Sequence, residues 1–156
     1  VLLYWSGHGK LGKFLWGHDD KHFTSDMFLS AVREMKDNHR FRKMLICGEP
    51  CYSESVLNVV EGIPGVLCLA SANTQESSFA DVFDSDMEVW LSDRFTNRIV
   101  DEIDRNPEQS FHQLYLSLVH DTNESHVSII NYSMFDNLYS ASPSEFFVPL
   151  RLPFIL

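Results

Sequence analysis

The stretch LICGEPCYSES at residues 45–55, together with YWSGHGKLG at residues 4–12, decides the fold of this chain. In each stretch a short apolar run stops abruptly in small and polar residues. This pattern is typical of a buried parallel strand that delivers a side chain to the carboxyl edge of a sheet. The apolar run at residues 1–5 is followed by His8, which lies between two glycines, and the run at residues 43–47 is followed by Cys51. We therefore expect both side chains at one edge of a parallel sheet.

His8 and Cys51 have chemical reason to be neighbours. A thiol is a good nucleophile only as the thiolate, and a nearby imidazole both accepts its proton and, once charged, stabilises it. The glycine at position 9 lets the backbone approach a ligand closely, so its amide, with that of Cys51, could form an oxyanion hole. A single His is more often structural than catalytic. The other six His residues lack flanking glycines at a strand end, and we expect them to lie at the surface or to have packing roles.

Composition limits the class of protein. With 156 residues and 44% hydrophobic residues, the chain is long enough for one domain with a sizeable core. The net charge of -10 disfavours nucleic acid and anionic membranes as partners. No apolar run approaches the roughly 18 residues that a membrane span needs. Because Val1 already lies in a strand-like run, we expect a further segment before it.

The three cysteines make an odd count, which does not indicate a disulfide framework. Cys47 and Cys68 sit in apolar runs, where a free thiol acts as a small hydrophobic residue. A metal site of Cys47, Cys51 and a His is a weaker alternative, because Cys47 should face the core. No cofactor is expected.

The order of apolar patterns predicts an α/β fold with a mostly parallel sheet. Helix 87–103 should bury Val89, Trp90 and Val100, among others, and helix 108–120 should bury Val119. The strands are expected at 1–5, 43–47, 66–71 and 126–132; the helices at 25–38, 53–60, 87–103 and 108–120; a loop at 6–13; and an irregular tail at 140–156.

Glu49 lies where the second strand ends. An unpaired buried carboxylate costs several kcal/mol, so a buried Glu49 should meet a basic group from the protein or a substrate. The simpler interpretation, which we favour from the residues alone, is an edge residue that reaches solvent. The segment 71–78 ends the third strand and should reach the same edge.

Several motifs together resemble the legumain-type cysteine peptidases, the asparaginyl endopeptidases of the C13 family, which have a caspase-like fold. These motifs cover roughly residues 1–132, and the combination is specific although each piece alone is weak. The family has Glu-Ala-Cys-Glu-Ser-Gly where this chain has Glu-Pro-Cys-Tyr-Ser-Glu; Pro50 lacks an amide and stiffens the turn. The matching stretches are YWSGHG at 4–9, FRKM at 41–44, EPCYSES at 49–55, ASANTQESS at 70–78, LSD at 91–93 and SHV at 125–127.

The resemblance implies a role for each matching residue. His8 and Cys51 would form the catalytic pair, with the Gly9 and Cys51 amides as oxyanion hole. Glu49 and Asp93 would line the S1 pocket for an Asn side chain, and Ser77 would lie on its wall. In the family, a basic pocket residue and an Asn that orients the His come from a strand that would precede Val1.

The resemblance also sets expectations for the whole chain. The fold should be a three-layer sandwich with helices on both faces of the sheet. Residues 1–135 should form the peptidase core, and residues 136–156 should form a tail that packs on it. The expected activity is cleavage of peptides or proteins after Asn, and after Asp in acid. The alternatives are a transamidase of the same family and an inactive peptidase-like binding domain. A zymogen, a separate N-terminal fragment or propeptide, and export to the lysosome, vacuole or exterior also follow from the resemblance.

Overall fold

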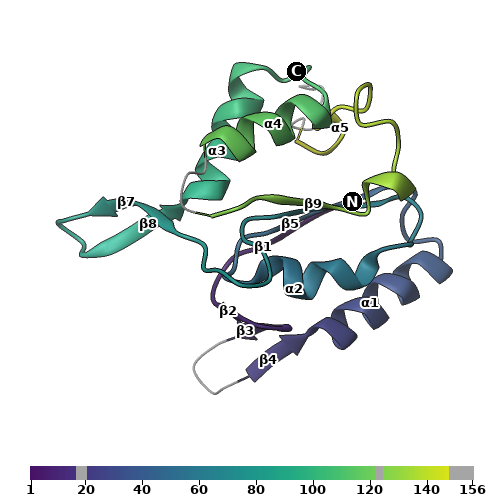
Figure 1. The fold of residues 1–156 in the computed structure, drawn as a ribbon, viewed down its shortest axis with the longest axis horizontal. Coiled ribbons are helices and arrows are strands. Elements are labelled where there is room, and N and C mark those ends of the chain that lie inside the picture. Colours follow the sequence, from purple (N-terminus) through teal and green to yellow (C-terminus); the bar gives the residue numbers. More distant parts are fainter. Residues whose placement is uncertain (17–20, 122–124, 148–156) are drawn as a thin grey trace, which may run out of the picture.

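A four-stranded sheet forms the centre of the computed structural model, which describes residues 1–16, 21–121 and 125–147 (Figure 1). Its strands are β1 (Leu2–Trp5), β5 (Met44–Gly48), β6 (Val66–Ala70) and β9 (Ser128–Ile130), in the order β1-β5-β6-β9. The first three are parallel and β9 runs antiparallel to β6. The predicted mixed α/β fold with a mostly parallel sheet is confirmed.

The two central strands are buried on both faces, as their continuous apolar sequences predict. In β5, Met44 and Ile46 face one core while Leu45 and Cys47 face the other. Figure 1 shows α1 and α2 over one face of the sheet, and α3, α4 and α5 over the other. The helices are α1 (Ser25–Asp37), α2 (Ser53–Leu57), α3 (Arg94–Arg105), α4 (Phe111–Asp121) and α5 (Ser144–Phe147), with 3-10 turns η1 (Asn58–Val60) and η2 (Tyr132–Met134).

Helix α1 begins and ends where its sequence signals predict. The Thr24 side chain accepts a hydrogen bond from the Met27 amide at 3.2 Å, which satisfies one free N–H of the first turn. Phe28 and Val32, one turn apart, bury the apolar stripe against the sheet. The chain leaves the helix at Asn38.

The expected loop at 6–13 is in part a small antiparallel sheet. This small sheet consists of β2 (Gly9–Lys10), β3 (Lys13–Trp16) and β4 (Lys21–Thr24), so it extends beyond the expected loop. Phe14 of β3 is buried, and the ring of Trp5 stacks on Phe23 of β4 with centroids 5.3 Å apart. These aromatic contacts hold the segment after β1 against the body.

The predicted helix at 87–103 is wrong in its first part. Residues Val89–Asp93 form strand β8, paired antiparallel with β7 (Ala80–Asp84), and the helix begins only at Arg94. Local pairing with β7, which the sequence analysis missed, suits the β-branched and aromatic run better than a helix does. The predicted burial is also wrong for four side chains, which are exposed: Val89, Trp90, Val100 and Val119.

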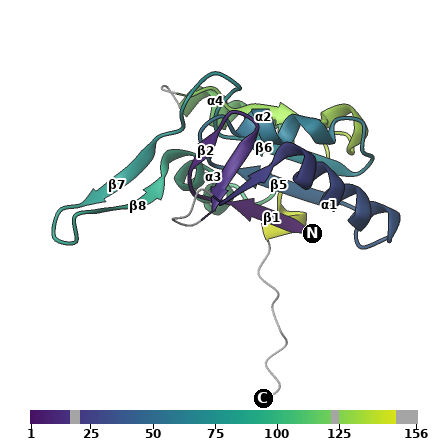
Figure 2. The same cartoon turned by 90° about the horizontal axis from the view of Figure 1, so that it is seen from below.

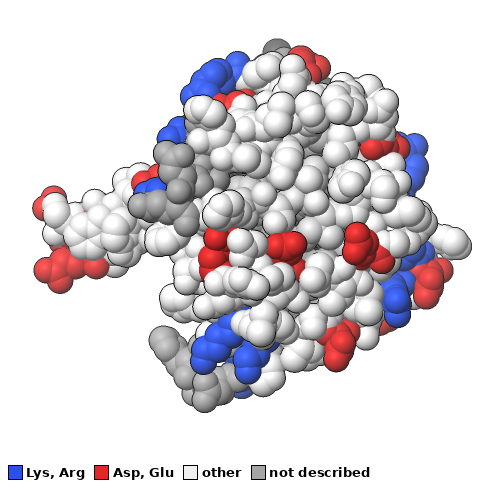
Figure 3. Space-filling view, in the orientation of Figure 1, with Lys and Arg blue, Asp and Glu red and all other residues white. Residues whose placement is uncertain are grey.

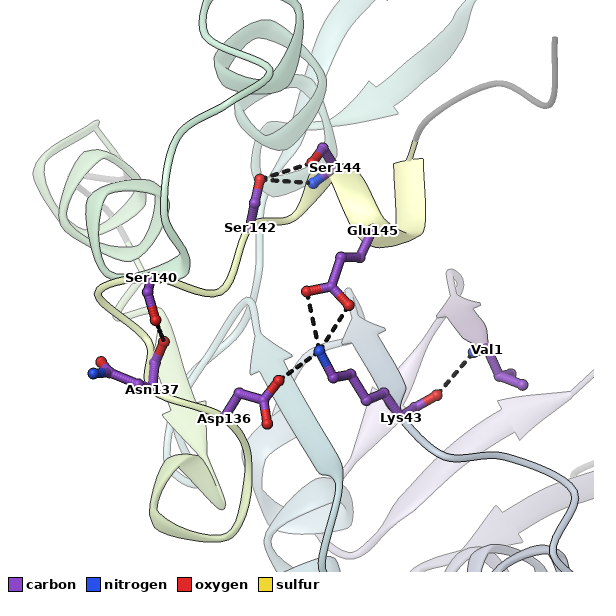
Figure 4. Close-up of polar contacts among 8 residues, drawn as sticks. All are labelled: Val1, Lys43, Asp136, Asn137, Ser140, Ser142, Ser144 and Glu145. Carbon is purple, nitrogen blue, oxygen red and sulfur yellow. Dashed lines mark hydrogen bonds and ion pairs between the residues drawn. The ribbon is translucent and has the colours of Figure 1, made fainter.

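The segment after β9 packs on the face of the sheet that α3 and α4 cover. The ring of Phe135 meets Phe111 of α4 edge-on, with centroids 5.7 Å apart. Figure 4 shows Lys43 between two carboxylates of this segment: its Nζ lies 2.5 Å from Asp136 and 2.7 Å from Glu145. Residues 148–156 of the expected tail lie outside the described residues.

Candidate active site

Three parallel strands end together, and this edge carries the candidate site. Register pairs Trp5 at the end of β1 with Gly48 at the end of β5. The Glu49 amide then donates to the Trp5 carbonyl at 2.9 Å, and the Ser71 amide donates to the Gly48 carbonyl at 2.9 Å. The segments after β1, β5 and β6 therefore start side by side, as predicted for strands that deliver side chains to one edge.

The His8 loop touches the Cys51 turn through Gly9. A Cβ added to Gly9 would lie 2.2 Å from the Cys51 carbonyl oxygen and 2.8 Å from the Cβ of Pro50. Only glycine allows this backbone approach. The residue next to His8 is thus in contact with the residue that carries the thiol, and the His8 side chain is exposed.

Cys51 is half-buried and faces the segment after β6. Its Sγ lies 3.9 Å from both the carbonyl oxygen and the hydroxyl of Ser78. Ser77, the predicted pocket residue, is exposed one position earlier. The sequence analysis missed Ser78, because nothing in the run Ser77-Ser78 indicates which hydroxyl faces the thiol.

The turn around the thiol is held by backbone hydrogen bonds. Tyr52 adopts a left-handed conformation with φ of 57°, and its amide donates to the Glu76 carbonyl at 2.9 Å. Glu76 in turn binds His126, with Oε2 2.8 Å from Nδ1. The helix predicted at 53–60 is divided into α2 and η1, so a helix of only five residues follows this turn.

Glu49 is buried, with 1% of its surface exposed, so the interpretation of a solvent-exposed edge residue is wrong. Its Oε2 accepts a hydrogen bond from the Tyr4 hydroxyl at 2.6 Å. Its Oε1 accepts one from the Thr96 hydroxyl. The Asp93 carboxyl also interacts with Glu49, and the basic group expected there, from the protein or a substrate, stays a prediction. Tyr4 and Thr96 were missed, because neither carries a sequence signal for this contact.

Glu49 and Asp93 interact, and their pKa values move in opposite directions. Burial by itself would raise the pKa of Glu49, but hydrogen bonds from Asp93, Thr96 and Tyr4 outweigh it and lower that pKa. Burial, together with the hydrogen bond and the charge of Glu49, raises the pKa of Asp93 to about 7. One carboxylate and one carboxylic acid therefore lie together below neutral pH.

The other two cysteines face the core, as predicted. Cys47 and Cys68 are both buried, and burial raises the pKa of Cys47 to about 12, so neither thiol is a nucleophile. Within residues 1–16, 21–121 and 125–147, no three His, Cys, Asp or Glu side chains are placed to hold a metal ion. No helix there is both long enough and apolar enough to cross a bilayer.

Comparison with known proteins agrees with this geometry. Residues 1–140 match the peptidase C13 family. The chain belongs to this family.

Its C13 relatives divide between two activities. A putative GPI-anchor transamidase of Caenorhabditis elegans is 32% identical over 100 residues, which cover 64% of this chain and 31% of the relative.

Other C13 relatives match longer stretches at lower identity. Mouse legumain is 27% identical over 129 residues, covering 81% of this chain and 29% of legumain. The GPI-anchor transamidase of Saccharomyces cerevisiae is 25% identical over 148 residues, covering 93% of this chain and 34% of the relative. The chain spans about a third of the length of these relatives.

Proposed function

We propose that this C13 chain carries the thiol and the imidazole of a cysteine endopeptidase that cleaves after Asn. The observation that supports the proposal is the close approach of Gly9 to the Cys51 carbonyl, which brings the His8 loop against the backbone of the residue that carries the thiol. We also expect the complete fold to be the caspase-like three-layer sandwich, with helices on both faces of the sheet.

The chemistry is thiol acyl transfer. His8 takes the proton of Cys51, and the thiolate attacks the carbonyl carbon after Asn, forming a C–S bond. The Gly9 and Cys51 amides donate to the oxyanion. His8 then gives its proton to the departing amine as the C–N bond breaks, and water hydrolyses the thioester, regenerating the thiol and releasing the new carboxylate.

The Glu49–Asp93 pair fits the side chain of Asn. Both Glu49 oxygens already accept hydroxyls, so the half-buried Asp93 is the carboxyl that meets the substrate. A carboxyl oxygen accepts a hydrogen bond from an NH₂ group. Because the Asp93 proton is hydrogen-bonded to Glu49, we infer that the remaining acceptor capacity of Asp93 binds the NH₂ group of Asn. Ser77 remains a proposed part of the pocket wall.

The pH dependence of cleavage tests this pocket. An Asp side chain is charged near neutral pH and is repelled by the pair, whereas its protonated form resembles Asn. We expect the ratio of Asn to Asp cleavage to fall several-fold from about pH 7 to about pH 4, as the substrate carboxyl becomes protonated. Assays of matched Asn and Asp peptides measure it, and a constant ratio would count against Glu49 and Asp93 as the pocket.

A thiol-directed inhibitor that contains Asn tests the catalytic pair directly. Stoichiometric labelling of Cys51, slowed in His8→Ala and absent in Cys51→Ala, is the expected result. The matched inhibitor with Gln in place of Asn should label slowly. Absence of labelling would favour an inactive peptidase-like binding domain instead.

A second activity is also tested, because one relative at 32% identity is a putative GPI-anchor transamidase. In transamidation, an amine instead of water attacks the thioester. Adding a peptide with a free amino terminus to the cleavage assay distinguishes the two: a ligated product at the expense of the carboxylate indicates a transamidase, and carboxylate alone indicates a peptidase. Export or lysosomal location, activation from a zymogen and a separate N-terminal fragment or propeptide remain proposals from the family resemblance.

A further inference from the structure

The hairpin formed by β7 and β8 extends away from the body of the molecule in both Figure 1 and Figure 2. Most of its large side chains are exposed; Trp90, for example, has 60% of its surface exposed. Two-stranded hairpins gain little stability alone, and contiguous exposed apolar surface typically marks an interaction site. The exposed apolar side chains are Val82, Phe83, Met87, Val89, Trp90 and Leu91.

One face of this hairpin continues from the candidate pocket. Alternate residues of β8 face the same side, so Leu91 and Val89 follow Asp93 along one face. Phe83 and Trp90 lie on the opposite face, with ring centroids 5.1 Å apart. Since a strand rises about 3.3 Å per residue, the apolar face begins within about 7 Å of Asp93 and continues for a few residues.

The charge of the hairpin narrows the choice of partner. Residues 79–93 include five acidic residues and no Lys or Arg. Figure 3 shows acidic side chains at the far end of the hairpin. This charge repels nucleic acid, anionic lipid and the hairpin of a second copy, and it attracts Lys and Arg.

We propose that the outer hairpin, residues 82–91, is an exosite for a segment of the polypeptide substrate that is rich in apolar and basic residues and adjoins the cleaved Asn. The exosite rests on the proposed function, because it assumes that Asp93 receives the Asn side chain. Apolar substrate residues pack on Val89 and Leu91, and basic residues pair with Asp86 and Glu88.

Binding of labelled peptides to the full chain carrying Cys51→Ala, which prevents cleavage, tests the exosite. The probes are a short peptide around Ala-Ala-Asn, the same peptide with a Leu-Lys-Leu-Lys-Leu-Lys extension on either side, and matched Leu-Glu extensions. The peptide with the Leu-Lys extension on one of the two sides should bind about tenfold more tightly than the short peptide. This gain in affinity should shrink as the salt concentration rises from about 50 to about 500 mM. The Leu-Glu extensions should give no gain.

Charge reversal makes the test sharper. In the double variant Asp86→Lys, Glu88→Lys, the Leu-Glu extension should increase the affinity and the Leu-Lys extension should not. The control, Asp101→Lys with Asp104→Lys on α3, makes the same charge change on another surface and should keep the original preference. An unchanged preference in the hairpin variant, or equal effects of both variants, overturns the exosite.

The apolar contact is tested separately. Val89→Ser with Leu91→Ser should abolish most of the gain, whereas the control with comparably exposed side chains on α4, Leu116→Ser with Val119→Ser, should not. Cleavage of the short peptide by the unmodified chain reports the proposed function alone. Cleavage of that peptide with no gain from any extension therefore disproves the exosite and leaves the peptidase assignment standing.

Discussion

At the scale of single residues, the Glu49 site shows how hydroxyl groups stabilise a buried carboxylate. A charged group in a core costs several kcal/mol unless its oxygens accept hydrogen bonds. Here Tyr4 and Thr96 supply two hydroxyl donors, and Asp93 supplies a proton. The same contacts leave Asp93 as the group of the pair that titrates near neutral pH.

Asp93 should make stability depend on pH. Its pKa of about 7 in the folded chain lies above the ordinary 3.8, so between these values the folded state holds a proton that the unfolded chain releases. The free energy of unfolding therefore falls as pH rises through this window. Asp93→Asn removes this titration.

From about pH 5 to about pH 8, the free energy of unfolding of Asp93→Asn should rise by roughly 1–2 kcal/mol relative to that of the unmodified chain. This is less than the full pKa shift implies, because the carboxyl is partly exposed. Chemical denaturation at both pH values measures the gain. Asp101→Asn, at an exposed position on α3, is the control and should show none.

Tyr4 should stabilise the buried carboxylate through its hydroxyl. Tyr4→Phe removes the donor 2.6 Å from Glu49 and should cost about 1.5–3 kcal/mol, the usual range for a hydrogen bond to a charged group. The cost should be largest above pH 5, where Glu49 is ionised. Tyr132→Phe, at an exposed hydroxyl, is the matched control in the same denaturation experiment. Equal stability of the two variants would contradict the role given to Tyr4.

At the scale of elements, Lys43 joins the start of β5 to the segment that contains α5. Its Nζ contacts Asp136 and Glu145, and those hydrogen bonds raise its pKa (Figure 4). Lys43→Met keeps the apolar stem and removes the charge. We expect a loss of about 1 kcal/mol, since the pairs are partly exposed, and faster amide exchange over residues 136–147.

Hydrogen-exchange mass spectrometry measures this effect segment by segment. Lys36→Met on α1 is the control, and it should leave exchange at 136–147 unchanged. Similar exchange in the Lys43 and Lys36 variants would mean that the aromatic contacts of Phe135 hold the segment without the ion pairs.

At the scale of the whole molecule, β1 is one of the two edge strands of the central sheet. Leu2 and Tyr4 are 39% and 46% exposed, and they border an apolar cavity of about 180 Å³ beside α3. Since the chain spans about a third of its relatives, we propose that a longer form of the protein adds a strand at this edge. That strand is where the resemblance places the basic pocket residue and the Asn beside His8.

A longer form should therefore protect β1. We expect the amides of residues 2–5 to exchange at least about tenfold more slowly there than in the chain of 156 residues, because an added strand closes the edge. The amides of α1, on a different part of the molecule, should exchange equally in both. Equal exchange at β1 would show that the added residues pack elsewhere.

The parallel strands, helix α1 and the approach of the His8 loop to the Cys51 turn can be predicted from the sequence, because they depend on local periodicity and on where apolar runs stop. The β7–β8 hairpin cannot be predicted in this way, since Val89 and Trp90 suit a helix or a strand until a partner strand is present. The partners of Glu49 likewise emerge only in the folded chain, because Tyr4 and Thr96 are distant in sequence and packing brings their hydroxyls to one carboxylate. Long-range contacts of this kind leave no local pattern.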